Sequence, residues 1–192
     1  MPKCSCHYLS LQVIHGQHNM MDNNNSGYPS PAEVNAISYI SDSVYLTNIV
    51  GACTMKMLPQ LGITSIINAS QDLECDKPYY GLVEYMRVPV PDSPHVDIYR
   101  YFDRVAERIH RTSRRGGRTL VHCQQGVSRS STLVMAYLMK YEGLTLSQAF
   151  TLVRRQRPIV NPNCGFWTQL MDYERKLYGY NTVSTRPGVN CY

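Results

Sequence analysis

The sequence predicts an α/β fold, with a central, mostly parallel twisted sheet of about five strands and helices on both faces. Short apolar runs typical of strands alternate with longer segments that have helical periodicity. Residues 63–68 are continuously apolar at their centre, as in parallel strands that are covered on both faces. Apolar residues recur at helical spacing over residues 97–113, which predicts an amphipathic helix. These residues are Ile98, Phe102, Val105 and Ile109.

The first expected elements form a hairpin. Two β-like runs, residues 36–40 and 44–47, flank a Ser-Asp-Ser turn. Residues 51–60 predict a short helix that ends at Gly62. The buried strand at residues 63–68 follows directly.

A second strand and a helix precede the central motif. Residues 85–90 predict a strand, which runs into a proline-rich loop that ends at Pro94. The prolines of this loop exclude a helix there and make the chain stiff and extended. The helix over residues 97–113 is ended by a Gly-Gly pair, and an apolar run then leads to Cys123.

Three helices are expected after Cys123. Residues 130–141 are apolar nearly all round, so this helix should be central. A capping box at residues 145–148 begins the next helix, which runs until Arg157 because a proline follows. Asn163 is a candidate cap for the last helix.

The chain of 192 residues divides into a folded domain and two flanking segments. We expect one domain over residues 36–180, a flexible N-terminal arm over residues 1–35 and a C-terminal tail over residues 181–192. The arm is rich in His, Asn, Ser and Pro and has no apolar period. Cys4 and Cys6 lie near histidines, but Cys-x-Cys is a poor spacing for structural zinc, so a disordered arm is favoured.

Composition predicts an intracellular protein, cytoplasmic or nuclear. No apolar run approaches the roughly 18 residues of a membrane span, and the N-terminus lacks the pattern of a secretory signal. The seven cysteines are odd in number and scattered, which does not indicate a disulfide framework.

The net charge of +5 gathers mainly in two arginine clusters. They comprise Arg108, Arg111, Arg114, Arg115 and Arg118, and then Arg154, Arg155 and Arg157. Such a basic surface favours acidic, phosphorylated partners, and a solvated helix face is the equally good alternative. A nucleic-acid partner is disfavoured, because no basic groove interleaved with aromatic residues is present in the sequence.

Residues 120–132 form the motif around which the predicted function is built. An apolar run places His122 and Cys123 at its end, a loop follows, and Arg129 precedes a helix. Backbone N–H groups of the loop and the helix N-terminus can bind phosphate oxygens, and Arg129 can bind two of them. The same donors favour the thiolate of Cys123, so we predict a nucleophile rather than an ordinary buried cysteine. The expected phosphate-binding residues are Gln124, Gln125, Gly126, Val127, Ser128 and Arg129.

A thiolate that attacks phosphorus expels an alkoxide or phenoxide, which a separate acid must protonate. Asp92 is the best candidate, because it follows a strand that should be parallel to the one ending in Cys123. The alternative for Asp92 is a turn-forming residue beside proline. Asp97 and Asp103 are the competitors, but Asp97 is a candidate helix cap and Asp103 lies within the helix.

The motif His-Cys-x-x-Gly-x-x-Arg-Ser at residues 122–130 resembles the signature of the protein tyrosine phosphatases. Its local form, with Ile67-Asn-Ala-Ser70 and Arg157-Pro-Ile-Val-Asn-Pro-Asn163, is most similar to the small atypical dual-specificity phosphatases. The resemblance implies that Ser130 hydrogen-bonds the sulfur, that His122 orders the loop and that Asn163 lies near it. A first-turn serine, a buried histidine and a helix cap are the respective structural alternatives.

The resemblance implies hydrolysis of phosphotyrosine, phosphoserine and phosphothreonine in proteins through a phosphocysteine intermediate. No metal or other cofactor is required by this reaction. Phosphorylated proteins are the expected partners, with MAP kinases as one candidate class, and the oligomeric state is left open. Lipid phosphatase activity is disfavoured, because phosphoinositide phosphatases of the superfamily carry lysines in this loop and residues 124, 125, 127 and 128 are uncharged. RNA phosphatase activity is disfavoured because the sequence shows no nucleic-acid groove. A catalytically silent phosphoprotein-binding module is the alternative from another class.

Overall fold

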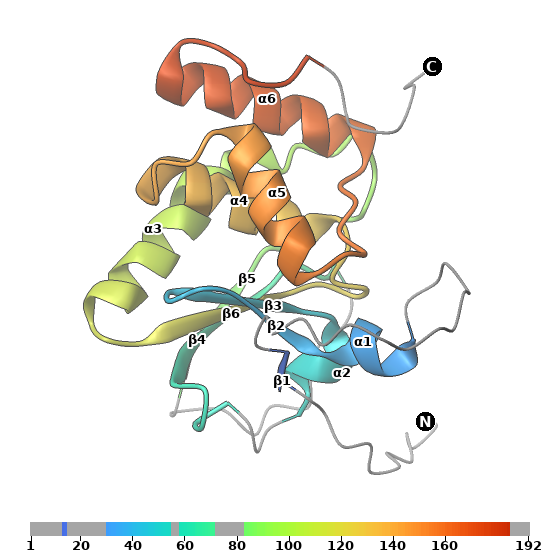
Figure 1. The fold of residues 1–192 in the computed structure, drawn as a ribbon, viewed down its shortest axis with the longest axis vertical. Helices are drawn as coiled ribbons and strands as arrows, with labels where there is room; N and C mark the ends of the chain where they lie inside the picture. Colours follow the sequence, from blue (N-terminus) through green and yellow to red (C-terminus); the bar gives the residue numbers. More distant parts are fainter. Residues whose placement is uncertain (1–12, 15–29, 55–57, 72–82, 185–192) are drawn as a thin grey trace.

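The computed structural model describes residues 13–14, 30–54, 58–71 and 83–184. In this part of the chain a single sheet has the strand order β1-β2-β3-β6-β4-β5 (Figure 1). The strands are β1 (Val13–Ile14), β2 (Ile37–Ser41), β3 (Val44–Thr47), β4 (Ile63–Asn68), β5 (Glu84–Arg87) and β6 (Arg118–His122). Only β2 and β3 pair antiparallel among these strands. The predicted mostly parallel sheet is therefore confirmed, and the short β1 extends it by one strand.

The register of the parallel strands brings their carboxyl ends to one edge of the sheet. Thr47 of β3 and Asn68 of β4 are both paired with His122 of β6, and Asn68 is also paired with Arg87 of β5. Cys123 and the loop that contains Asp92 therefore leave the sheet at the same edge. Open α/β sheets bind their ligands at this edge.

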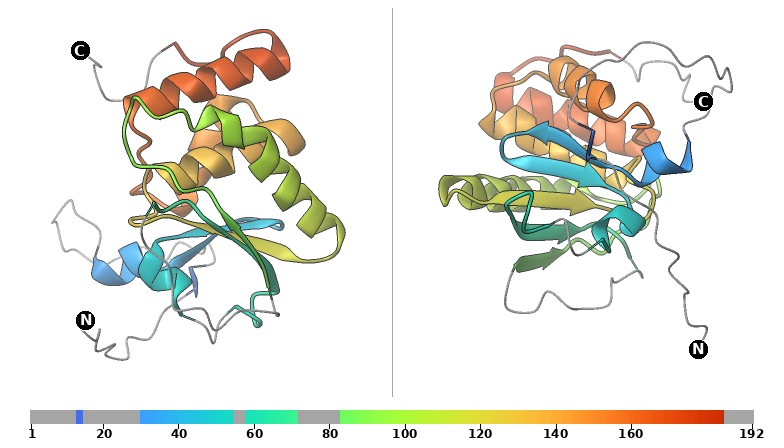
Figure 2. Two further views of the ribbon diagram at one scale, coloured as in Figure 1. Left: turned by 180° about the vertical axis from the view of Figure 1, so that it is seen from behind. Right: turned by 60° about the horizontal axis from the view of Figure 1, so that its bottom comes forward.

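Helices lie on both faces of the sheet (Figure 2). The helical segments are α1 (Pro31–Asn35), α2 (Ile49–Ala52), the 3-10 turn η2 (Tyr99–Tyr101), α3 (Phe102–Arg114), α4 (Arg129–Tyr141), α5 (Leu146–Gln156) and α6 (Cys164–Tyr178). The long helices α3 to α6 cover one face, and α2 lies on the other. Within the described residues, no helix is long and apolar enough to cross a membrane.

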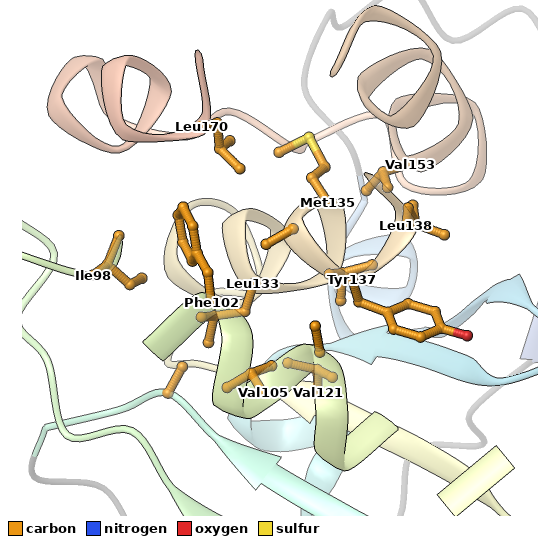
Figure 3. Packing of buried hydrophobic residues seen from close by; sticks show 14 of the residues in the cluster. Ile98, Phe102, Val105, Val121, Leu133, Met135, Tyr137, Leu138, Val153 and Leu170 are labelled. Carbon is orange, nitrogen blue, oxygen red and sulfur yellow. The ribbon is translucent and has the colours of Figure 1, made fainter. Parts of the chain in front are cut away.

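Alternation along the strands fills two cores, one on each face. Val121 of β6 belongs to the larger core under α3, α4, α5 and α6, whereas its neighbour Leu120 belongs to the smaller core beside Ala52 of α2. Figure 3 shows the larger core, in which Leu133 of α4 lies near Phe102 of α3. Because both faces are covered at the centre of the sheet, adjacent residues of one strand are both apolar and buried there, as Ile66 and Ile67 of β4 are. Full burial of such an aliphatic side chain contributes about 1.5–3 kcal/mol.

Several boundaries differ from the expected ones. The helix expected over residues 51–60 is α2, which ends at Ala52 and begins after Asn48, whose side chain accepts the Gly51 N–H at 2.9 Å. The predicted strand over residues 85–90 stops at Arg87, before the prolines. The helix expected over residues 97–113 starts as η2 and continues as α3. Local side-chain contacts and proline residues determine where these elements begin and end, and the spacing of apolar residues does not predict such boundaries.

The predicted helix starts after Cys123 are confirmed. Thr145 and Gln148 form the capping box of α5, and the Asn163 side chain caps α6. Helix α1 and strand β1 lie before residue 36, where no regular structure was expected. Most of the proposed arm lies outside the described residues, so the domain limits at residues 36 and 180 stay predictions.

Candidate active site

Cys123 lies directly after β6 and faces the N-terminus of α4. It is only 1% exposed, and its Sγ accepts hydrogen bonds from the Gly126 N–H and the Ser130 hydroxyl, each at 3.2 Å. Both donors favour a negatively charged sulfur over a neutral thiol. The structure thus places Ser130 beside the sulfur, as expected from the sequence.

The carbonyl groups of residues 124–127 all accept hydrogen bonds from outside the loop. Their donors are Ile49 N at 3.2 Å for Gln124, Arg157 Nη2 at 3.3 Å for Gln125, Arg157 Nε at 2.8 Å for Gly126 and Asn161 N at 3.0 Å for Val127. In a trans peptide the carbonyl and the following N–H point in opposite directions. The N–H groups of residues 125–128 therefore point away from these donors, and that of Gly126 already reaches the sulfur.

Gly126 is required by this loop for two reasons. Its φ is +67°, a backbone conformation that side-chain-bearing residues rarely adopt. A Cβ at this position would also lie 2.6 Å from the Thr47 carbonyl oxygen and 2.7 Å from Arg157 Nη2. The glycine of the motif therefore allows the loop to lie directly on β3 and on Arg157.

Arg129 is the first residue of α4 and is 7% exposed. Its Nη1 donates to the Val90 carbonyl at 3.2 Å, and its Nε lies 3.6 Å from Asp92 Oδ2. No acidic residue occupies the first turn of α4, and the Ser128 side chain does not cap it. The positive end of this helix thus adds to the charge of Arg129.

Asp92 lies in the loop after β5, and its side chain is 33% exposed. Its Oδ1 accepts hydrogen bonds from Ser128 Oγ and Asn163 Nδ2, both at 2.8 Å. Ser128 Oγ in turn accepts the Asn163 backbone N–H at 3.1 Å, which directs its hydroxyl proton toward Asp92. The structure therefore brings Asp92, Ser128, Arg129 and Asn163 together, and Asn163 is both a helix cap and a partner of Asp92.

The two competing aspartates are engaged elsewhere. Asp97 accepts the Arg100 N–H at 3.2 Å, but the N-cap residue of η2 is Ile98, so Asp97 is not the helix cap expected from the sequence. Asp103 binds Lys140 of α4 at 2.6 Å, and also Tyr173 and Lys176 of α6. The hydrogen bond from Lys140, followed by those from Tyr173 and Lys176, holds the pKa of Asp103 well below its usual range. Of the three aspartates, Asp92 is the one that is hydrogen-bonded to the loop after Cys123 in the described structure.

His122 is buried at the end of β6, with 1% of its surface exposed. Burial lowers the pKa of His122 to about 4, against a smaller opposing effect of the Cys123 backbone. The imidazole is therefore neutral at pH 7, and its Nδ1 has no hydrogen-bond partner among the described residues, so the role expected for His122 in ordering the loop stays a prediction.

Helix α6 holds the loop of Asp92 through two residues that were not predicted from the sequence. A Cβ on Gly165 would lie 1.8 Å from the Pro94 carbonyl oxygen, so loop and helix are in direct backbone contact. Gln169 accepts the N–H groups of Ile98 and Tyr99 at 2.9 and 2.8 Å, and donates to the Val96 carbonyl at 2.8 Å. No local sequence pattern marks Gly165 or Gln169, because their partners lie about 70 residues earlier.

Arg157 was expected in a surface cluster with Arg154 and Arg155, and this was wrong. Arg154 and Arg155 are exposed, whereas Arg157 is 2% exposed and lies behind the loop of residues 124–127. Burial lowers the pKa of Arg157 to about 10, which leaves it a cation at neutral pH. Within the described part of the chain, no group of three or more His, Cys, Asp or Glu residues could hold a metal ion.

Comparison with known proteins agrees with this geometry. Residues 44–176 match the family described as dual specificity phosphatase, catalytic domain. Human dual specificity protein phosphatase 14 is 45% identical over 154 residues, which are 80% of this chain and 77% of that protein.

Solved structures lead to the same family. The crystal structure of a mouse putative dual specificity phosphatase complexed with zinc tungstate is 32% identical, with a TM-score of 0.71, and the match covers 81% of this chain and 96% of that one. Human DUSP28 is 33% identical, with a TM-score of 0.70 and coverage of 78% and 97%. The chain therefore belongs to the dual specificity phosphatases, a family of protein phosphatases.

Proposed function

We propose that this chain hydrolyses phosphotyrosine, phosphoserine and phosphothreonine in proteins through a phosphocysteine intermediate on Cys123. One observation carries the proposal. A buried sulfur that accepts two hydrogen bonds lies at the centre of a loop whose carbonyls are all directed outward, with Arg129 and Asp92 at the same edge of the sheet. This arrangement offers a nucleophile, an anion site and an acid to one phosphate group.

In the first step the Cys123 thiolate attacks phosphorus, and the bond from phosphorus to the leaving oxygen breaks. The N–H groups of residues 125–128 and the guanidinium of Arg129 bind the equatorial oxygens. Asp92 gives its proton to the leaving oxygen. Because Ser128 and Asn163 both donate to Oδ1 of Asp92, Oδ2 is the oxygen that carries this proton.

In the second step Asp92, now a carboxylate, takes a proton from water as the water attacks phosphorus. The bond from phosphorus to sulfur breaks, and inorganic phosphate leaves. The Ser130 hydroxyl, 3.2 Å from the sulfur, stabilises the departing thiolate. We assign His122 no proton transfer in either step, because it is buried at the end of β6 and away from solvent.

The substrate class follows from the anion site and from the family. The mouse relative was crystallised with zinc tungstate, and tungstate is a tetrahedral oxyanion like phosphate. The side chains of residues 124, 125, 127 and 128 are uncharged, which favours phosphoproteins over polyanionic lipid headgroups. We place MAP kinases among the candidate substrates and the reaction in the cytoplasm or nucleus, because a nucleophilic thiolate persists in a reducing compartment.

Steady-state hydrolysis of para-nitrophenyl phosphate and of a doubly phosphorylated peptide tests the proposal. We expect wild-type turnover that Cys123→Ser abolishes. Asp92→Ala should lower turnover of the peptide and keep or tighten its binding, because only the transition state needs the proton. If the wild type binds the peptide without hydrolysing it, the protein is a phosphoprotein-binding module instead.

A further inference from the structure

Arg157 places a buried positive charge directly behind the loop that follows Cys123. It is the largest side chain among the fully buried residues of the described chain. All its guanidinium nitrogens donate hydrogen bonds to protein acceptors. The acceptors are Gly126 O (2.8 Å), Gln125 O (3.3 Å), Val34 O (2.8 Å), Ala36 O (3.1 Å) and Ser38 Oγ (3.5 Å).

None of these acceptors carries a charge. Among the ion pairs formed by described residues, none includes Arg157. A buried cation without a carboxylate is costly, and arginine in a purely structural position is commonly paired. Neutral acceptors alone therefore hold the charge of Arg157, and an anion near the loop would stabilise it further.

The sulfur of Cys123, when it is a thiolate, is such an anion. A Cys123 thiolate raises the pKa of Arg157 through their Coulombic attraction, against the larger effect of burial. The attraction is mutual, so positive charge at Arg157 and negative charge at the sulfur stabilise each other. A phosphate dianion held by the loop N–H groups would be attracted in the same way.

The geometry of Arg157 also fixes the loop. Its Nε and Nη2 hold the carbonyls of Gly126 and Gln125 on the side away from Cys123. If either peptide flipped, a carbonyl oxygen would face the sulfur and the phosphate. Lysine could keep the charge, but it has fewer donors and no planar fork to reach acceptors on both the loop and the segment before β2.

We propose that Arg157 is a positioning residue for the reaction, which keeps the loop carbonyls turned outward and supplies positive charge behind Cys123. It does not touch the substrate and acts through the loop. The inference rests on the proposed function only in taking Cys123 as the nucleophile and the loop as the anion site.

The test compares Arg157→Met, which removes charge and donors, with Arg157→Lys, which removes the fork and keeps the charge. Arg155→Met is the matched control, because Arg155 is exposed and lies two residues away. Two measurements need no turnover. One is the pH midpoint of iodoacetamide alkylation, read on the Cys123 peptide by mass spectrometry, and the other is the Kd of orthovanadate. Thermal unfolding shows that each variant is folded.

For Arg157→Met we expect the alkylation midpoint to rise by about one pH unit and vanadate to bind about tenfold more weakly, since one unit is a tenfold change in thiolate fraction. For Arg157→Lys we expect a midpoint close to that of the wild type and the same order of loss in vanadate affinity. If Arg157→Met does not fold, Arg157→Lys decides on vanadate affinity alone.

The inference is overturned if the folded Arg157 variants match Arg155→Met in both alkylation midpoint and vanadate affinity and differ only in stability. Failure of the proposed function gives a different pattern. In that case the wild type does not hydrolyse phosphopeptides, while vanadate binding still depends on Arg157.

Discussion

Gly165→Ala should displace Asp92, the proposed general acid, although residue 165 itself contacts no reacting group. The new Cβ would lie 1.8 Å from the Pro94 carbonyl oxygen and 2.6 Å from Pro94 Cα. Backbone atoms cannot rotate aside, so the loop must move by about 1.6 Å to bring the oxygen to the 3.4 Å of ordinary van der Waals contact. Asp92 lies two residues earlier in the same loop and must move with it.

The size of the effect follows from this displacement. A misplacement of about 1 Å in a catalytic group can cost on the order of a hundredfold in rate. We therefore expect kcat on a phosphoserine or phosphothreonine peptide to fall about a hundredfold. The loss should be smaller with para-nitrophenyl phosphate, whose leaving group needs little protonation. The rate of Cys123 alkylation should stay unchanged, because the loop of residues 124–129 is not displaced.

The matched control is Gly179→Ala at the other end of α6. Gly179 has φ +80°, and a Cβ at this position would have no atom within 4 Å, so alanine costs stability there without a clash. This variant should lose about 1 kcal/mol of unfolding free energy and keep its kcat. By helix propensity alone, Gly165→Ala would stabilise α6 by up to about 1 kcal/mol. A folded Gly165→Ala with wild-type kcat on both substrates would refute the reasoning.

Three further changes separate the remaining contributions. Asn163→Ala should lower the unfolding free energy by about 1 kcal/mol, because the α6 cap is lost, and should also lower kcat. Asn163→Asp should keep the cap and lower only kcat. Denaturant unfolding and steady-state kinetics measure the two effects. Equal kcat for Asn163→Asp and wild type would show that the amide contact with Asp92 is dispensable. Asp103→Asn should cost less than about 1 kcal/mol at pH 7, because its carboxylate is half exposed. The pKa of Asp103 is lowered in the folded state, so its carboxylate stabilises the fold above the unfolded-state pKa of about 4, and this stabilisation is lost as the pH falls further. Melting temperatures of the wild type and of Asp103→Asn should therefore converge in acid. Ser130→Ala should slow the second step by about tenfold and give a burst of the first product in stopped-flow traces, and a trace without a burst would place the loss in the first step.

The predictable features were those with short-range causes. The capping box at Thr145 and Gln148 and the cap at Asn163 depend on residues within one helical turn, and both are present. The placement of Cys123 and Ser130 also follows from a strand, a loop and a helix start in direct succession. Asp92 could be assigned because parallel strands end at one edge of the sheet.

The features that the sequence did not predict depend on partners far along the chain. Arg157 follows two exposed arginines, and only its contacts with residues 34–38 and with the loop explain its burial. Gly165 and Gln169 were missed for the same reason, because their contacts are with the backbone of residues 94–99, which packs on α6. The local pattern of charged and apolar residues cannot predict contacts with such distant parts of the chain. These residues nevertheless contact the loop after Cys123 and the loop that contains Asp92.

In the proposed mechanism the phosphoryl group of the substrate is transferred to the sulfur of Cys123 before it is released as inorganic phosphate. Rapid acid quenching of the Ser130→Ala variant with a labelled phosphopeptide, followed by peptide mapping, tests it most directly, because this variant should accumulate the intermediate. We predict label on the peptide that contains Cys123 and none with Cys123→Ser. Turnover of the substrate with no label on Cys123, or turnover by Cys123→Ser itself, would contradict the claim.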